Sequence, residues 1–216
     1  MRDKIKATAA DLIVKYGYRG VSFREIAEIL STTRANLHYH FGNKSGLVEE
    51  VLDDYARGTL ERYANIWTNP DTTLREKVAA TVAFNRERYN KFNANGDKGN
   101  PWSLMIRLRS DRDALTPKMQ SILQTTSHEF ESLVRIAVSL AVRSGELAPD
   151  APQQQIVIQL ATIIHYAGSV TRDAGRFSRL SDLWEATLVT IETAYGTGKA
   201  QQKPAAKSKA AAKARS

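Results

Sequence analysis

The chain contains no cysteine among its 216 residues. It therefore cannot form a disulfide bond, bind a metal through thiolates or use a cysteine nucleophile. Long apolar runs are also missing. The longest, residues 156–170, is interrupted by Gln159 and His165 and is shorter than the roughly 18–20 apolar residues that cross a bilayer. We therefore expect a protein of a reducing compartment that does not span a membrane.

Motifs of enzymes are absent as well. The sequence shows no nucleophile and base at a catalytic spacing, no glycine-rich phosphate loop and no cluster with metal-ligand spacing. His38 and His40 are two positions apart, which places their side chains on different faces of a helix and argues against a shared metal ion. We expect no enzymatic activity, no cofactor and no bound metal.

Acidic residues are fewer than basic ones, and the formal net charge is +8. Residues 199–216 contain five lysines, one arginine and no acid, so they carry +6 and leave only +2 for residues 1–198. The charge of the main part of the chain is therefore a weak argument for a nucleic-acid partner. We predict that the Lys- and Ala-rich residues 199–216 form a disordered tail.

Helical spacing of apolar residues recurs along the whole chain, and no strand-like alternation competes with it. This pattern predicts an all-α protein of about nine helices, with a loop between Asn93 and Pro101 that we expect to be exposed. The apolar stripes cover residues 5–16, 23–30, 37–41, 47–67, 74–92, 102–108, 119–141, 156–170 and 180–195.

Residues 22–47 carry the pattern that points most directly to a function. Ser22 and Glu25 have the spacing of a capping box, and Thr33 is placed to cap the next helix after a short turn. The second of these helices can bury only Leu37 and Phe41. Its outward residues are polar or small: Thr33, Arg34, Ala35, Asn36, Tyr39 and His40. Two short helices with an outward-facing polar second helix are typical of a helix-turn-helix, which reads the major groove of DNA.

Residues 4–52 combine these caps with an alanine-rich first helix, a glycine at its end and an aromatic residue at the end of the third helix. The matching positions are Ala9, Gly17, Ser22, Ile26, Ala27, Phe41 and Lys44. In this respect the chain resembles the TetR family of bacterial transcriptional regulators. The resemblance implies a helix-turn-helix DNA-binding unit over residues 1–46, followed by a ligand-binding and dimerisation unit over residues 47–198.

The resemblance also implies roles for single residues. Arg34, Ala35 and Asn36 would face base edges. Contacts to the DNA backbone would come from Ser22, Arg24, Thr33, His38, Tyr39, His40 and Lys44. Two positions depart from the family: Ser31 stands where a glycine is usual, which suggests a strained turn, and His38 replaces a tyrosine but can still donate to a phosphate.

Regulators of this kind bind a palindromic operator with two recognition helices, so a homodimer is expected. We predict its interface on the last two helices, although the first of them could instead lie wholly inside the core. The interface residues would be Ile156, Leu160, Ile164, Ala167, Leu180, Trp184, Leu188 and Ile191. Candidates for contact with a small-molecule effector, each of which could instead be a core residue, are Phe84, Tyr89, Phe92, Trp102, Met105, Arg107, His128 and His165.

The resulting interpretation is a repressor that binds double-stranded DNA as a homodimer and is released by a small molecule of unknown identity. The N-terminal residues lack the apolar core of a secretory signal, so we expect the protein in the cytoplasm, on the nucleoid when DNA is bound. The alternative is an architectural protein that binds any DNA through its basic tail and responds to no effector.

Overall fold

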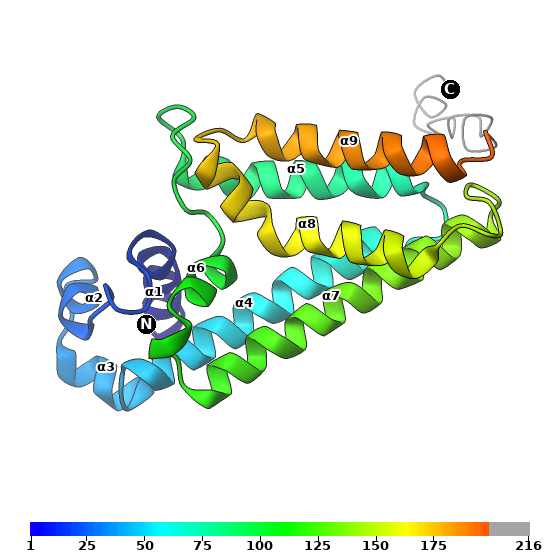
Figure 1. Cartoon of the computed structure of the whole chain (residues 1–216). Coiled ribbons are helices and arrows are strands. Elements are labelled where there is room, and N and C mark those ends of the chain that lie inside the picture. The colour runs from blue at the N-terminus through cyan, green and yellow to red at the C-terminus, as the bar shows by residue number, and fades with distance from the viewer. Residues whose placement is uncertain (199–216) are drawn as a thin grey trace, which may run out of the picture.

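A computed structural model describes residues 1–198 of the chain (Figure 1). These residues form nine α-helices and one short 3-10 helix, and their only strand-like pairing is an isolated bridge between Leu147 and Gly196. The predicted all-α fold of about nine helices is confirmed. The tail predicted over residues 199–216 lies outside the described residues.

Three short helices gather at one end of the molecule: α1 (Arg2–Tyr16), α2 (Phe23–Ile29) and α3 (Arg34–Phe41) (Figure 1). Their shared core contains Ile5, Ile13, Ile26, Leu37 and Leu47, none of which is exposed to solvent. We call residues 1–46, which contain these helices, the head. The remaining residues, 47–198, are called the body.

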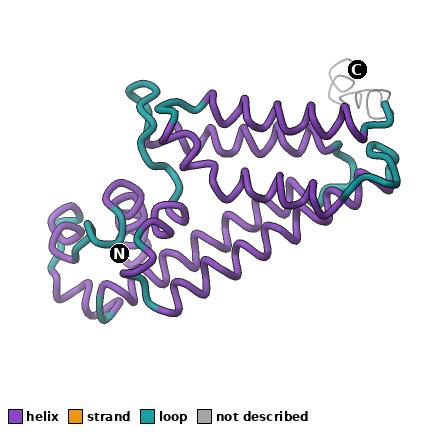
Figure 2. Tube along the Cα trace, viewed as in Figure 1, coloured by secondary structure: helices purple, strands orange, loops and turns teal. Residues whose placement is uncertain are grey.

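The body is built around two long helices, α4 (Lys44–Trp67) and α7 (Pro117–Arg143), which lie side by side (Figures 1 and 2). Burial of one apolar face of each helix drives this packing. The other elements of the body are α5 (Leu74–Phe92), α6 (Leu104–Ser110), the 3-10 helix (Arg112–Ala114), α8 (Gln153–Asp173) and α9 (Ser178–Tyr195). α8 packs on α7, and α9 packs on both α8 and α5.

One helix joins the head to the body. The proposed boundary between residues 46 and 47 falls inside the first turn of α4, which runs unbroken from Lys44 to Trp67. Near its start α4 buries Leu47 in the head core, and near its end it buries Trp67 against Trp184 of α9, with ring centroids 6.2 Å apart. A displacement of α4 in the body is therefore transmitted directly to the head.

The loop between α5 and α6 is more tightly held than the sequence predicted. Most of its residues are exposed, as expected, but Asn93 and Gly99 are buried. The carboxylate of Asp97 accepts hydrogen bonds from the Tyr89 hydroxyl and, at 3.0 Å, from the backbone N–H of Phe177. The loop is thus fixed to α5 and to the turn between α8 and α9.

The turn between α2 and α3 contains a strained serine. Ser31 has a φ of 49°, in the left-handed region that a side chain with a Cβ disfavours. The unfavourable turn conformation predicted for this position is present.

Replacing Ser31 with Gly is expected to raise the free energy of unfolding by about 0.5–1 kcal/mol, because relief of the Cβ strain exceeds the entropy that glycine loses on folding. Urea unfolding followed by circular dichroism measures the change. The control is Ser144→Gly at the end of α7, where φ is −76° and the same substitution should not stabilise. Equal effects at the two positions would show that Ser31 carries no strain.

Candidate DNA-binding site

The two helices of the corner begin at the predicted capping residues. The hydroxyl of Ser22 accepts a hydrogen bond from the N–H of Glu25, and that of Thr33 accepts one from the N–H of Asn36, both at 3.2 Å. Each bond satisfies a backbone donor that the first turn of a helix leaves free. These caps fix the residues at which α2 and α3 begin and so help to set the angle between the two helices.

The outward face of α3 is open to solvent. Leu37 and Phe41 are buried beneath the helix and anchor it to the head core, while Tyr39 on the other side keeps 86% of its surface exposed. The outward residues are Thr33, Arg34, Ala35, His38 and Tyr39, which are exposed, with Asn36 and His40, which are half-buried. The helix therefore presents a polar surface that no other described element covers.

Arg34 and Asn36, both predicted to read bases, differ in whether their side chains already have hydrogen-bond partners. Within residues 1–198, Arg34 makes neither an ion pair nor a side-chain hydrogen bond, so its guanidinium is available to a base edge. The amide nitrogen of Asn36 instead donates to the Thr32 hydroxyl at 3.1 Å. Bidentate recognition of adenine uses the amide oxygen and one of the two amide hydrogens, so Asn36 can keep its bond to Thr32, which restricts its orientation, while it reads a base.

Arg24, a predicted phosphate contact, is paired on its own helix. Its guanidinium donates to the carboxylate of Glu28, 2.9 Å away, and both side chains are exposed. The hydrogen bond to Glu28 raises the pKa of Arg24. In the free protein this carboxylate therefore competes with a DNA phosphate for the same cation.

Replacing Glu28 with Gln is expected to release Arg24 for DNA. If one more phosphate is neutralised, the slope of log K against log salt steepens by about 0.9, and affinity at low salt rises. Titrations at several salt concentrations measure both effects. Glu61→Gln, the same charge change at an exposed position of α4 in the body, should leave the slope unchanged. A constant slope in both variants would mean that Arg24 does not reach the backbone.

Lys44 is held inside the head. Its ammonium donates to the backbone carbonyl of Tyr18 at 3.0 Å and lies 4.4 Å from the centre of the Tyr18 ring. Burial lowers the pKa of Lys44, and the nearby carboxylate of Asp111 opposes that shift. The start of α4 is capped by Asn43. Lys44 thus links the loop between α1 and α2 to α4. If Lys44 also contacts a DNA phosphate, its ammonium has to bind the phosphate and the Tyr18 carbonyl together.

His38 also has an internal partner. Its Nδ1 lies 2.7 Å from the carbonyl oxygen of Gly42, and its ring packs edge-on against Phe23 at 4.9 Å. A carbonyl only accepts, so Nδ1 carries the proton and Nε2 of the neutral ring is an acceptor. His38 can donate to a phosphate from Nε2 only when the ring is doubly protonated.

A second connection joins head and body at the end of α1. The backbone N–H of Tyr18 donates to the Asp111 carboxylate at 2.7 Å. Gly17 has a φ of 77°, and a Cβ at this position would overlap with the same carboxylate. Arg107 lies alongside. Arg107 thus sits at the junction of α1 and α6 and does not line the cavity described below.

The interior of the body contains a small cavity of about 20 Å³ between α4, α5, α6, α7 and α8. Three of the predicted effector contacts line it: Trp102, Met105 and His165. Lining residues that the sequence analysis did not select are Thr59, Tyr63, Asn85, Arg88, Ser103, Ile106, Arg109, Phe130 and Ile164. The cavity is thus more polar than the predicted, largely aromatic site.

The other predicted effector contacts lie away from this cavity. Tyr89 packs against Phe177 with ring centroids 5.2 Å apart, Phe84 packs behind Tyr63 at 5.6 Å, and Phe92 is half-buried near the end of α5. His128 is exposed on α7. For these residues the structure favours core or surface roles.

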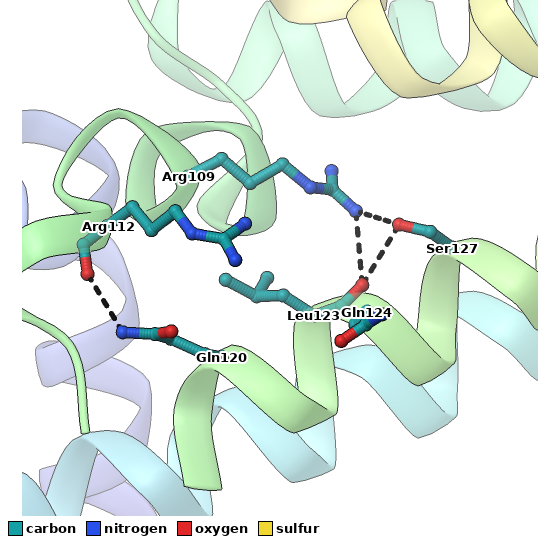
Figure 3. A pocket seen from close by; sticks show the side chains of 6 residues that line it. All are labelled: Arg109, Arg112, Gln120, Leu123, Gln124 and Ser127. Atoms are coloured by element: carbon teal, nitrogen blue, oxygen red, sulfur yellow. Dashed lines mark hydrogen bonds between the residues drawn. The ribbon is translucent and has the colours of Figure 1, made fainter. Parts of the chain in front are cut away.

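A larger cavity, about 290 Å³ in volume, lies between α6, the 3-10 helix and α7 (Figure 3). The guanidinium of Arg109 donates to the Ser127 hydroxyl at 2.8 Å and lines this cavity as well as the inner one. The remaining lining residues are Arg112, Gln120, Leu123, Gln124 and Ser127, none of which is acidic.

The predicted dimer residues lie inside the single chain. All eight are buried in the core, with exposed fractions between 0 and 6%: Ile156, Leu160, Ile164, Ala167, Leu180, Trp184, Leu188 and Ile191. This corrects the predicted surface, because the inward stripes of α8 and α9 are used to pack the body. The exposed apolar side chains of the two helices are Ile158, Tyr166 and Val189, and a surface hollow of about 550 Å³ is lined by residues of both helices.

Residues 1–198 contain no group of three or more His, Asp or Glu side chains placed to bind a metal ion. No helix among them has both the length and the apolar character needed to cross a bilayer.

A capped corner that presents a polar helix from a small helical head is a helix-turn-helix, which defines a DNA-binding protein. Residues 5–51 match the family model described as "Bacterial regulatory proteins, tetR family". Over these residues the chain matches the DNA-binding region of this family of transcriptional regulators, in agreement with the resemblance seen in the sequence.

Named relatives agree with this assignment. HTH-type transcriptional regulator RutR of Escherichia coli (strain K12) is 26% identical over 164 residues, which cover 76% of this chain and 72% of RutR. HTH-type transcriptional regulator QacR of Staphylococcus aureus is 36% identical over 53 residues, 24% of this chain and 28% of QacR. These relatives are named as regulators, not as enzymes.

Solved structures share the fold. A TetR-family transcriptional regulator from Agrobacterium tumefaciens superimposes with a TM-score of 0.75 at 20% identity, covering 88% of this chain and 96% of that one. The reduced form of Escherichia coli NemR gives a TM-score of 0.72 at 14% identity, over 86% of this chain and 94% of that one.

Proposed function

We propose that this regulator is a repressor that binds a palindromic operator as a homodimer and is released by a small-molecule effector. The observation that carries the proposal is the exposed and unpaired Arg34 on a capped α3. Arg34, Ala35 and Asn36 would read base edges, and Ser22, Arg24, Thr33, His38, Tyr39, His40 and Lys44 would contact the DNA backbone. The protein would act in the cytoplasm, on the nucleoid when bound.

The surface of α8 and α9 supports the homodimer. Ile158, Tyr166 and Val189 are 52, 61 and 46% exposed, and Ile158 and Tyr166 line the same hollow; exposed apolar patches are typical of interaction sites. Association of two such surfaces about a twofold axis would bury them and leave two heads for two half-sites. A dimer also doubles the base contacts, which raises specificity.

The contacts between head and body support release by an effector. Besides α4 itself, they include the bond between Tyr18 and Asp111 and the ion pairs Arg2–Glu50 and Lys6–Asp54, both at 2.6 Å. α7 in turn is attached to the start of α4, where Glu49 accepts from Thr116 at 2.7 Å and pairs with Lys118 at 3.2 Å. A ligand that shifts α6 or α7 would move these contacts and hence the spacing of the two heads. It must bind one spacing more tightly than the other.

Selection of random oligonucleotides by the purified protein tests the proposal. We expect an enriched palindrome whose half-sites are about 10 base pairs apart, centre to centre, or a multiple of that distance. No enrichment, together with equal affinity for unrelated sequences, would overturn it and favour binding through charge alone.

A further inference from the structure

Arg88 on α5 is half-buried, and its guanidinium has no anionic partner within residues 1–198. Its guanidinium lies 5.1 Å from the ring centre of Tyr55, 5.2 Å from that of Phe84 and 5.3 Å from that of Trp102, and it donates to the Tyr55 hydroxyl. No carboxylate in residues 1–198 forms an ion pair with it. The charge is thus surrounded by aromatic rings and one neutral hydroxyl.

Such an arrangement is unfavourable for the protein by itself. Burial lowers the pKa of Arg88 to about 10, so the group is still charged at neutral pH. Aromatic faces attract a cation and offset part of its lost hydration, but they satisfy few of the five N–H donors of a guanidinium. An anion placed in the cavity would supply the missing partner.

Further unpaired polar atoms lie around the same cavity. Asn85 is 1% exposed, and its oxygen accepts from the Tyr63 hydroxyl at 3.1 Å, which leaves its amide nitrogen buried and without a partner. Nε2 of His165 is likewise buried and unpaired within the described chain. Asn85, Arg88 and His165 all line the inner cavity, and none of its lining residues is acidic. Buried polar groups left without partners are uncommon in native proteins.

The size of the cavity limits what it holds in this state. A volume of about 20 Å³ accommodates about one water molecule, so an organic ligand must enlarge it. Arg109 lines both this cavity and the outer one of about 290 Å³, and within residues 1–198 its guanidinium donates to the Ser127 hydroxyl and the Leu123 carbonyl. Displacement of Arg109 would join the two spaces.

We infer that the joined cavities form the effector site, and that the effector is a small organic carboxylate. Its charge pairs with Arg88, one of its oxygens accepts from Asn85, and its apolar body lies against Trp102 and Phe130. The inference rests on the proposed function, because it names the class of the effector. It also explains transmission, since Arg109 belongs to α6, the helix that precedes Asp111 and its bond to the head.

Matched acids and amides test the charge requirement. Benzoate, phenylacetate and indole-3-acetate are compared with benzamide, phenylacetamide and indole-3-acetamide by thermal unfolding of the full chain. At about 100 times its Kd, an acid that binds is expected to raise Tm by about 5 °C or more, and its amide is not. Equal effects of acids and amides, or no effect of any acid, would overturn the inference.

Substitution of Arg88 tests the site. Arg88→Met keeps an unbranched apolar stem but removes the charged guanidinium, so we expect an unchanged or higher Tm without ligand and no rise with acid. The control is Arg62→Met, which removes an exposed arginine 5.7 Å from the outer side of the Phe84 ring and should retain the rise. A rise that survives in Arg88→Met, or a ligand-free Tm far below that of Arg62→Met, would assign Arg88 a purely structural role.

Operator binding separates this inference from the proposed function. An Arg88-dependent rise in Tm with acids, but no enriched palindrome, would support the site and overturn the proposed regulation. An enriched palindrome released by neutral compounds alone would support the regulation and overturn the carboxylate site. Both are supported if acids release the operator from the wild-type protein and from Arg62→Met but not from Arg88→Met.

Discussion

Replacing Ile158 with Glu is expected to convert the proposed homodimer into monomers and to weaken operator binding by about 10³-fold or more. Ile158 is 52% exposed in the single chain and lines the surface hollow between α8 and α9. In a symmetric dimer two carboxylates would be buried there without partners, and each would lose its hydration. Sedimentation measures the oligomeric state, and titration with the selected operator measures the affinity.

Ile136→Glu is the matched control for this prediction. Ile136 lies on α7, is 43% exposed and does not line the hollow, so the same substitution should leave both the dimer and the affinity intact. If the Ile158→Glu variant remained dimeric, the dimer interface would lie elsewhere on the protein. Ile158→Glu that is monomeric but binds the operator normally would instead show that one head suffices.

The sequence could not show which face of α8 packs inside the body and which faces solvent. Apolar residues occur nearly all round this helix, so periodicity identifies it as buried on several sides but does not rank its faces. Ile156 and Leu160 pack on α7 and the core, whereas Ile158, two positions away from each, faces outward. Only the placement of α7 and α9 settles which stripe is internal, and that placement depends on contacts between distant segments.

The head was predictable because its signals are local. The caps at Ser22 and Thr33 and the helix end at Gly17 involve bonds between residues no more than four positions apart. The bond between Tyr18 and Asp111 joins residues 93 positions apart and leaves no comparable pattern in the sequence. The contacts within the DNA-reading corner could therefore be expected, but its attachment to the body could not.

The inner cavity was only partly predictable from the sequence. Asn85 and Arg88 lie seven and ten positions after Val78, on the inward stripe of α5, so the sequence does contain polar residues in an apolar register. The predicted ligand contacts include neither Asn85 nor Arg88. Even with these two residues, the short helix α6 had to be placed before Arg109 and Met105 could be assigned to the same cavity.

Replacing Arg34 with Ala is expected to weaken binding to the selected operator by about 1–3 kcal/mol and to relax the preference at one base of each half-site. Arg34 is exposed, starts α3 and has no ion-pair partner in the described chain, so its removal disturbs no internal contact. Affinity for unrelated DNA should change much less. Competition titrations with the operator and with a scrambled duplex measure the two effects.

The same comparison distinguishes base reading from phosphate contact at neighbouring positions. Asn36→Ala should also reduce discrimination, and unlike Arg34→Ala it removes an internal hydrogen bond, the one from Asn36 to Thr32. In the Glu28→Gln background, where Arg24 is released, Arg24→Ala should weaken operator and scrambled duplex alike and flatten the salt slope by about 0.9. If Arg34→Ala behaved like Arg24→Ala, the guanidinium at the start of α3 would contact the backbone. Sequence reading would then lie further along α3, towards Tyr39.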